Sequence, residues 1–101
     1  MTFHGFEISE EKIAGFCREN KISEFAVFGS ILTGDFRPSS DIDILVTFYP
    51  NCGYSLFELA VIQEKLQNIF GRKVDLIEKA ALKNPFRKKE ILDHMEVIYA
   101  A

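Results

Sequence analysis

Residues 28–46 read FGSILTGDFRPSSDIDILV, and this stretch decides the fold. A short apolar run, residues 24–28, stops at Gly29 and predicts a strand. Turn-forming residues fill the middle of the stretch, so we expect residues 30–40 to form a short helix and a loop. Residues 41–48 are apolar apart from two aspartates and a threonine, and they predict a second strand. Two strands joined by a compact loop are therefore expected.

Two further helices are marked by capping residues on either side of this stretch. Residues 9–20 have a helical spacing of apolar positions, and Ser9 is a suitable N-cap at their start. Ser55 and Glu58 form a capping box that opens a second helix, and Gly71 stands where a helix-ending glycine belongs. The pattern therefore predicts one helix before the two strands and one after them.

The C-terminal third adds another strand and another helix. Residues 73–77 predict a third strand, and residues 88–95 predict a last helix with Pro85 near its start. Residues 97–99 are apolar and fit either a helix end or a short strand. This order is typical of an α/β (α+β) fold with a small mixed sheet of three or more strands, helices packed on it and one exposed face. We expect a single domain over residues 1–101.

Composition restricts the class of function. The chain has 101 residues, of which 48% are hydrophobic and 27% are charged, as in an ordinary globular domain. A net charge of −3 argues against direct binding of nucleic acid, which needs a basic surface. The chain shows no signal-peptide pattern and no membrane-spanning apolar run. Cys17 and Cys52 form no C-x-x-C motif, so we expect a cytoplasmic protein with two reduced thiols.

Aspartates interrupt the second predicted strand in an alternating pattern. Side chains of a strand point to opposite faces in turn, so Ile42 and Ile44 are expected to face the core. Asp41 and Asp43 then share the other face, with Cα atoms about 6–7 Å apart. Two carboxylates this close repel each other, and a hard cation such as Mg²⁺ is their natural partner. The strand therefore predicts a metal site.

The third strand repeats this pattern, because Asp75 lies opposite the face of its apolar neighbours. If the strands are adjacent, Asp75 completes a cluster that could hold two metal ions about 3.5–4 Å apart. Gly29 allows close backbone approach to a ligand, and Ser30 would open a helical turn able to bind phosphate. Each feature alone is more often a surface or turn residue, and only their combination predicts a joint metal and phosphate site.

The same stretch resembles the polymerase-β-like nucleotidyltransferase superfamily, whose hallmark is Gly-Ser, ten or so residues, and then Asp-x-Asp. Here residues 31–40 separate Gly29-Ser30 from Asp41-Ile42-Asp43, and Asp75 matches the third family carboxylate. The short chain resembles the minimal nucleotidyltransferase (MNT) group, over residues 9–99.

This resemblance implies a set of roles for the matched residues. Gly29 and Ser30 would hold the triphosphate of ATP, and Asp41 and Asp43 would hold Mg²⁺. Asp75 would hold a second metal ion and help to deprotonate the acceptor hydroxyl. Minimal members resemble the antitoxin of HEPN–MNT toxin–antitoxin pairs. Such an antitoxin transfers AMP from ATP to a tyrosine of its partner, a helical HEPN-domain ribonuclease, and silences it.

One departure from the family pattern leaves alternatives open. The family often has Gly-Ser-x-Ala-Arg-Gly, whereas Thr33 stands here just before the second glycine and no arginine stands at Ile31 either. Arg37 could bind the nucleotide instead, or it could be a plain surface arginine. The first alternative function is an antitoxin that neutralises its toxin by binding alone. The second is a small-molecule adenylyltransferase, whose relatives usually carry an additional helical domain.

Overall fold

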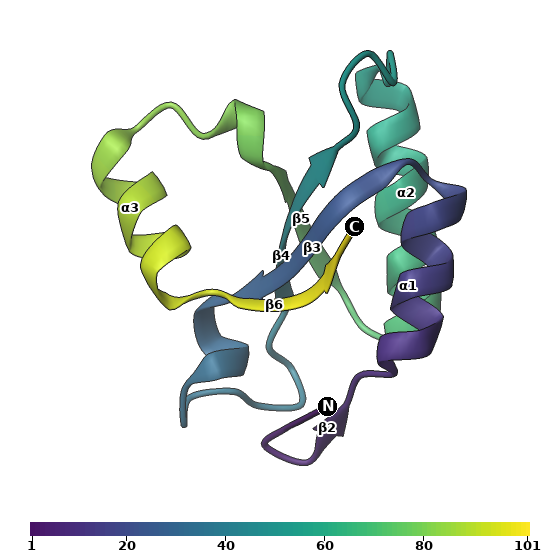
Figure 1. Ribbon diagram of the computed structural model, residues 1–101. Helices are drawn as coiled ribbons and strands as arrows, with labels where there is room; N and C mark the ends of the chain where they lie inside the picture. The colour runs from purple at the N-terminus through teal and green to yellow at the C-terminus, as the bar shows by residue number, and fades with distance from the viewer.

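A computed structural model describes residues 1–101, and its elements alternate between strands and helices (Figure 1). The strands are β1 (Thr2–Phe3), β2 (Phe6–Glu7), β3 (Ile22–Phe28), β4 (Ile42–Phe48), β5 (Val74–Glu78) and β6 (Glu96–Ala100). The α-helices are α1 (Glu10–Glu19), α2 (Leu56–Phe70) and α3 (Pro85–His94), and short 3-10 helices are η1 (Gly29–Leu32) and η2 (Lys79–Ala81).

Four of the strands form a mixed sheet in the order β5-β4-β3-β6. Strands β4 and β5 are parallel, whereas β3 runs antiparallel to both of its neighbours. The mixed α/β sheet and the adjacency of the second and third predicted strands are thus confirmed. The ambiguous residues 97–99 belong to β6, which pairs with β3 and buries Ile98 against the core.

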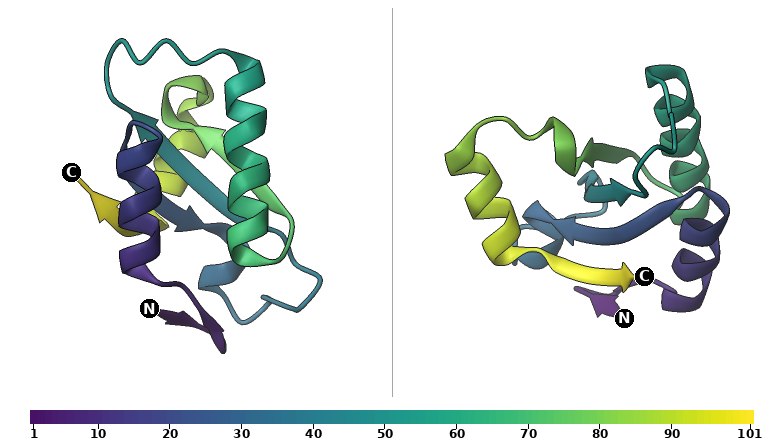
Figure 2. Two further views of the ribbon diagram at one scale, coloured as in Figure 1. Left: turned by 90° about the vertical axis from the view of Figure 1, so that its right-hand side faces the viewer. Right: turned by 45° about the horizontal axis from the view of Figure 1, so that its top comes forward.

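Helices cover the sheet on both sides, as the two views of Figure 2 show. Helices α1 and α2 pack on the face that carries Ile42, Ile44 and Val46, and this layer holds the main hydrophobic core. Helix α3 lies over the opposite face, where Leu45 packs with other apolar side chains, namely Phe28, Leu82 and Ile91. The expectation of an exposed face was therefore wrong where α3 covers this second cluster.

The helix ends follow from their capping residues. Ser55 and Glu58 form both hydrogen bonds of a capping box at the start of α2, and Gly71 ends that helix with φ +68°. Helix α3 begins at Pro85, three residues before the predicted start at residue 88. Asn84 is its N-cap, and proline is favoured at the first helical position, so the helix starts there.

A short N-terminal hairpin, β1 with β2, was not predicted. Its turn places His4 at φ +51° and Gly5 at φ +83°. The hairpin brings the ring of Phe6 against Phe36 of the β3–β4 loop, with ring centres 6.0 Å apart, and against Phe70 at 6.1 Å. It therefore packs on the loop that precedes the two aspartates. No helix of the chain has the length and apolar character that crossing a membrane requires.

Candidate active site

Three aspartates lie next to one another on the sheet face opposite the main core. Asp43 of β4 and Asp75 of β5 are directly paired in the parallel register. Asp41 precedes β4 by one residue and lies two residues from Asp43. Ile42, between Asp41 and Asp43, and Ile44, after Asp43, are fully buried, which confirms the predicted alternation of faces. The structure therefore brings the three sequence-predicted carboxylates together.

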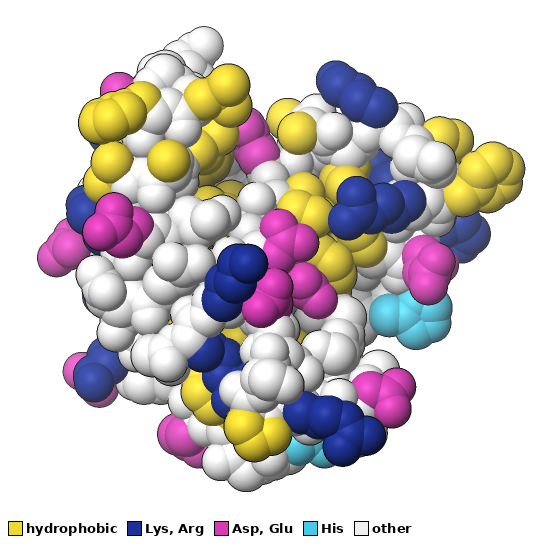
Figure 3. Space-filling view, turned by 180° about the vertical axis from the view of Figure 1, so that it is seen from behind, with side chains coloured by type: hydrophobic (Ala, Val, Ile, Leu, Met, Phe, Trp, Pro, Cys, Tyr) yellow, Lys and Arg dark blue, Asp and Glu magenta, His cyan; other side chains and the backbone are white.

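The electrostatics of the cluster centre on Asp43. Burial raises the pKa of Asp43, and the charges of Asp75 and Asp41 raise it further, while the charge of Arg87 acts in the opposite direction. Asp43 is half-buried, whereas Asp41 and Asp75 are exposed. Acidic side chains gather near the middle of the face shown in Figure 3, with lysine and arginine side chains beside them. Such concentrated negative charge favours a bound cation.

Gly29 holds the backbone against this cluster. It has φ +75°, a conformation that side-chain-bearing residues rarely adopt. A Cβ atom on residue 29 would overlap Oδ2 of Asp43 and lie 3.1 Å from its Cγ. Both backbone conformation and space therefore require glycine at the junction of β3 and η1. The group that Gly29 approaches is the Asp43 carboxylate, and its predicted approach to a ligand stays a prediction.

The turn after Gly29 is closed by hydrogen bonds within the loop. Residues Gly29–Leu32 form η1, as expected for a short helical turn opened at Ser30. The Ser30 carbonyl accepts hydrogen bonds from the Thr33 backbone N–H and from its Oγ1, both at 3.0 Å. Thr33 Oγ1 in turn accepts the Asp35 N–H at 3.1 Å. Thr33 therefore fixes the loop but brings no positive charge to it.

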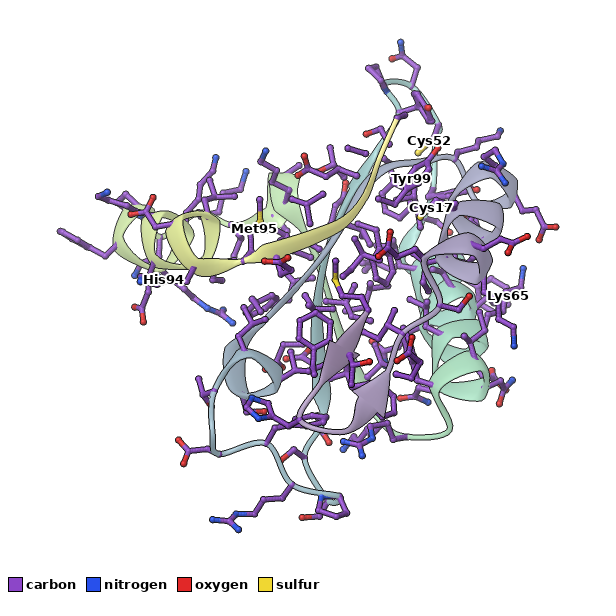
Figure 4. The ribbon with its side chains drawn as sticks, turned by 60° about the horizontal axis from the view of Figure 1, so that its bottom comes forward. Cys17, Cys52, Lys65, His94, Met95 and Tyr99 are labelled. Carbon is purple, nitrogen blue, oxygen red and sulfur yellow. The ribbon has the colours of Figure 1, made fainter.

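A cavity of about 540 Å³ lies between η1 and α3. Its lining includes three apolar side chains (Phe28, Leu32 and Ile91), together with Gly29, Thr33, Arg87, Glu90 and His94. Figure 4 labels His94 at the end of α3. Cavities of this size are typical of small-molecule sites.

Arg87 is the functional candidate that sequence reasoning missed. It lines this cavity with Gly29, and its charge opposes the raised pKa of Asp43. The available signal was the spacing of residues 87, 90, 91 and 94, which share one face of a helix that starts at Pro85. Arg37 does not join this group. It is exposed and lines a separate hollow with Phe36 and other residues, namely His4, Gly5, Phe6, Pro38 and Arg72, so nucleotide binding by Arg37 stays a prediction.

The chemistry of the cluster fits a hard divalent cation. Burial and then repulsion from Asp75 and Asp41 raise the pKa of Asp43, and a bound cation would relieve that repulsion. No group of three or more His, Cys, Asp or Glu side chains is arranged so that it could hold a metal ion by itself. Magnesium needs no such cage, since it usually takes one or two carboxylates and completes its octahedron with water and substrate phosphates. The aspartates therefore suit a magnesium ion whose remaining ligands would be water and phosphate oxygens.

The two cysteines take no part in this site. Cys17 is fully buried on α1, and burial raises the pKa of its thiol to about 12. Cys52 lies in the loop after β4, and both thiols are free (Figure 4). A thiol with such a high pKa is a poor nucleophile, so Cys17 serves packing.

Residues 10–98 match the family model described as a nucleotidyltransferase domain. The candidate protein adenylyltransferase MJ0128 of Methanocaldococcus jannaschii is 44% identical over 72 residues, which cover 70% of each chain. The protein adenylyltransferase MntA of Thermococcus cleftensis is 36% identical over 78 residues, covering 77% of this chain and 74% of that protein.

A solved complex shows the same fold. A tri-AMPylated HEPN toxin of Shewanella oneidensis in complex with MNT antitoxin gives a TM-score of 0.66 at 21% identity. The match covers 91% of this chain and 70% of the solved chain.

Proposed function

This chain belongs to the nucleotidyltransferase domain family, and we propose that it is an antitoxin that transfers AMP from ATP to a tyrosine hydroxyl of a cognate HEPN ribonuclease. The observation that carries this proposal is the carboxylate cluster, in which Asp43 and Asp75 are paired in register and Asp41 is adjacent. Gly29 packs against the same cluster, which supports the proposal because the backbone assigned to phosphate then lies beside the carboxylates assigned to the metal.

The proposed reaction displaces pyrophosphate from ATP. The tyrosine oxygen forms a bond to the α-phosphorus, while the bond from the α-phosphorus to the oxygen bridging it to the β-phosphate breaks. The proton of the tyrosine hydroxyl passes to Asp75, which is exposed and open to an acceptor from outside. Gly29 and Ser30 would hold the triphosphate, and Asp41, Asp43 and Asp75 would hold Mg²⁺. When magnesium is bound, it neutralises phosphate charge during the displacement.

Arg87 supplies the positive side chain that the loop after Gly29 lacks. Thr33 stands where the family often has arginine, and it is engaged in hydrogen bonds within the turn. Arg87 reaches the same cavity from α3. We therefore assign to Arg87 contact with the phosphates, where charge develops as pyrophosphate leaves. The apolar part of the cavity suits the nucleoside.

The partner assignment rests on the relatives and on the solved complex of the same fold. Two relatives are named as protein adenylyltransferases, and the solved complex of the same fold joins an AMPylated toxin to an MNT antitoxin.

The test is the intact mass of a HEPN partner co-expressed with this chain. Wild-type protein is expected to add one or more AMP units to the partner, and Asp41→Asn with Asp43→Asn is expected to add none. In the purified reaction, removal of Mg²⁺ with a chelator should stop transfer. An unmodified, verified HEPN partner would contradict the proposal.

One observation favours a second function, neutralisation by binding alone. No arginine is present at Ile31 or Thr33, so the phosphate-binding loop has less charge than is usual in the family. If binding suffices, a folded double variant with Asp41→Asn and Asp43→Asn still neutralises the toxin in a growth assay. If transfer is required, the same variant binds the toxin but leaves it active.

A further inference from the structure

Arg72 connects the two segments that carry the aspartates. It lies in the turn between α2 and β5, three residues before Asp75. Its Nη1 donates hydrogen bonds to the carbonyl oxygens of Arg37 at 3.2 Å and of Ser40 at 3.1 Å. Ser40 is the residue immediately before Asp41. A single guanidinium therefore joins the strand of the third carboxylate to the loop that leads into the first.

The loop that Arg72 binds is itself a closed turn. The Ser40 N–H donates to the Arg37 carbonyl at 2.9 Å, and the Arg37 N–H donates to Ser40 Oγ at 2.9 Å. Arg72 thus binds both ends of this turn. The Ile42 N–H donates to the Lys73 carbonyl at 3.0 Å, which continues the connection into the pairing of β4 with β5.

Two aromatic rings fix the orientation of the Arg72 guanidinium. Its central carbon lies 4.7 Å from the ring centre of Phe6 and 4.6 Å from that of Phe36. The rings come from the N-terminal hairpin and the loop, and they shield the half-buried side chain from water. Arginine suits this place because its planar group can contact aromatic rings and donate to two acceptors at once, which a lysine ammonium cannot match.

We propose that Arg72 is a positioning residue that sets Asp41 relative to Asp43 and Asp75 for binding of the divalent cation. The inference rests on the proposed function, because it assumes that this aspartate cluster binds the divalent cation. Arg72 itself forms hydrogen bonds to carbonyl oxygens and ring contacts only, so it acts through the loop backbone. Loss of such supporting contacts typically costs about 10–100-fold in metal affinity or activity.

The experiment compares Arg72→Lys and Arg72→Met with a matched Arg18→Lys control, an exposed arginine on α1. Binding of Mn²⁺ is measured by the loss of the free-ion EPR signal, and AMP transfer is measured on the partner. Both Arg72 variants are expected to bind Mn²⁺ about 10-fold more weakly and to transfer AMP about 10–100-fold more slowly. Arg18→Lys is expected to change neither.

A stability-matched variant separates positioning from general loss of stability. Phe6→Leu removes one ring from Arg72 but leaves both hydrogen bonds to the loop. At equal melting temperature, Arg72→Lys is expected to lose more Mn²⁺ affinity than Phe6→Leu. Unchanged Mn²⁺ affinity in Arg72→Lys, or an equal loss in Phe6→Leu, would overturn the inference. Mn²⁺ binding by wild type without AMP transfer would overturn the proposed function and leave the positioning role of Arg72 intact.

Discussion

Replacement of Gly29 by alanine tests the contact that joins the backbone to the carboxylate cluster. At φ +75° an alanine costs about 1–2 kcal/mol relative to glycine, because the left-handed region crowds its Cβ. The same Cβ overlaps Asp43 Oδ2, so the carboxylate or the backbone must shift. Overpacking of this kind adds about 1–3 kcal/mol. We therefore expect Gly29→Ala to lower the free energy of unfolding by the sum of the two costs.

Gly53→Ala is the matched control for this substitution. Gly53 has φ +72°, yet an added Cβ would meet no atom within 4 Å. The control therefore incurs the backbone cost of about 1–2 kcal/mol without the clash. The free energy of unfolding of both variants is measured in urea. If their m-values are unchanged, the difference between the two losses is the cost of the clash with Asp43. In an Asp43→Ala background, the cost of Gly29→Ala is expected to fall to that of Gly53→Ala.

The activity of Gly29→Ala should fall more than its stability suggests. Misplacement of a reacting group by about 1 Å can cost about 100-fold in rate, and Asp43 has to move to make room for the methyl group. We expect AMP transfer to drop about 100-fold in Gly29→Ala and to stay near wild type in Gly53→Ala. Equal stability losses in the two variants, together with full transfer activity in Gly29→Ala, would refute the reasoning.

Three further predictions concern charge and burial. The pKa of Asp43 is raised in the folded state, so folding stability without Mg²⁺ falls as pH rises through that pKa. Asp43→Asn is therefore expected to raise the Mg²⁺-free melting temperature at pH 7, and the difference from wild type should narrow toward acid pH. An unchanged or lower melting temperature at pH 7 contradicts this. Arg87→Ala is expected to slow AMP transfer about 10-fold or more through loss of a phosphate contact. Replacement of the exposed Lys83 by alanine should leave the rate unchanged. If the two variants transfer AMP at the same rate, Arg87 does not contact the phosphates. The thiol of Cys17, with its pKa raised to about 12, should resist iodoacetamide at pH 8.5 until urea unfolds the chain, while Cys52 is labelled in the folded protein; equal labelling of both would contradict the burial.

The sequence predicted the aspartate face because strand alternation is a local property. Buried Ile42 and Ile44 place Asp41 and Asp43 on the other side whatever the rest of the chain does. Capping chemistry is equally local, which explains the correct placement of the α2 start and of Gly71. The pairing of Asp43 with Asp75 needed one additional assumption, adjacency of their strands, and the sheet order confirms it.

The remaining features depend on contacts between distant segments. The strands of the N-terminal hairpin have two residues each, which is too few to show the alternation of a strand. The strand conformation of β6 depends on its pairing with β3. Helix α3 covers part of the aspartate face because Leu82 and Ile91 pack on Leu45. That packing brings Arg87 to the cavity beside Gly29. Arg37 is closer to Gly29 in the sequence, yet it lines a separate hollow. Distance along the sequence alone could therefore not show which arginine lies beside Gly29.

The central claim is that Asp41, Asp43 and Asp75 act as one site for AMP transfer. The most direct measurement is the initial rate of AMP transfer to the HEPN partner for Asp43→Asn, Asp75→Asn and the double variant, each shown to be folded. Groups that act as a unit are strongly non-additive, so each single variant is expected to lose nearly all activity and the double variant little more. A near-wild-type rate for Asp75→Asn, or a double-variant loss equal to the product of the two single losses, would contradict the claim.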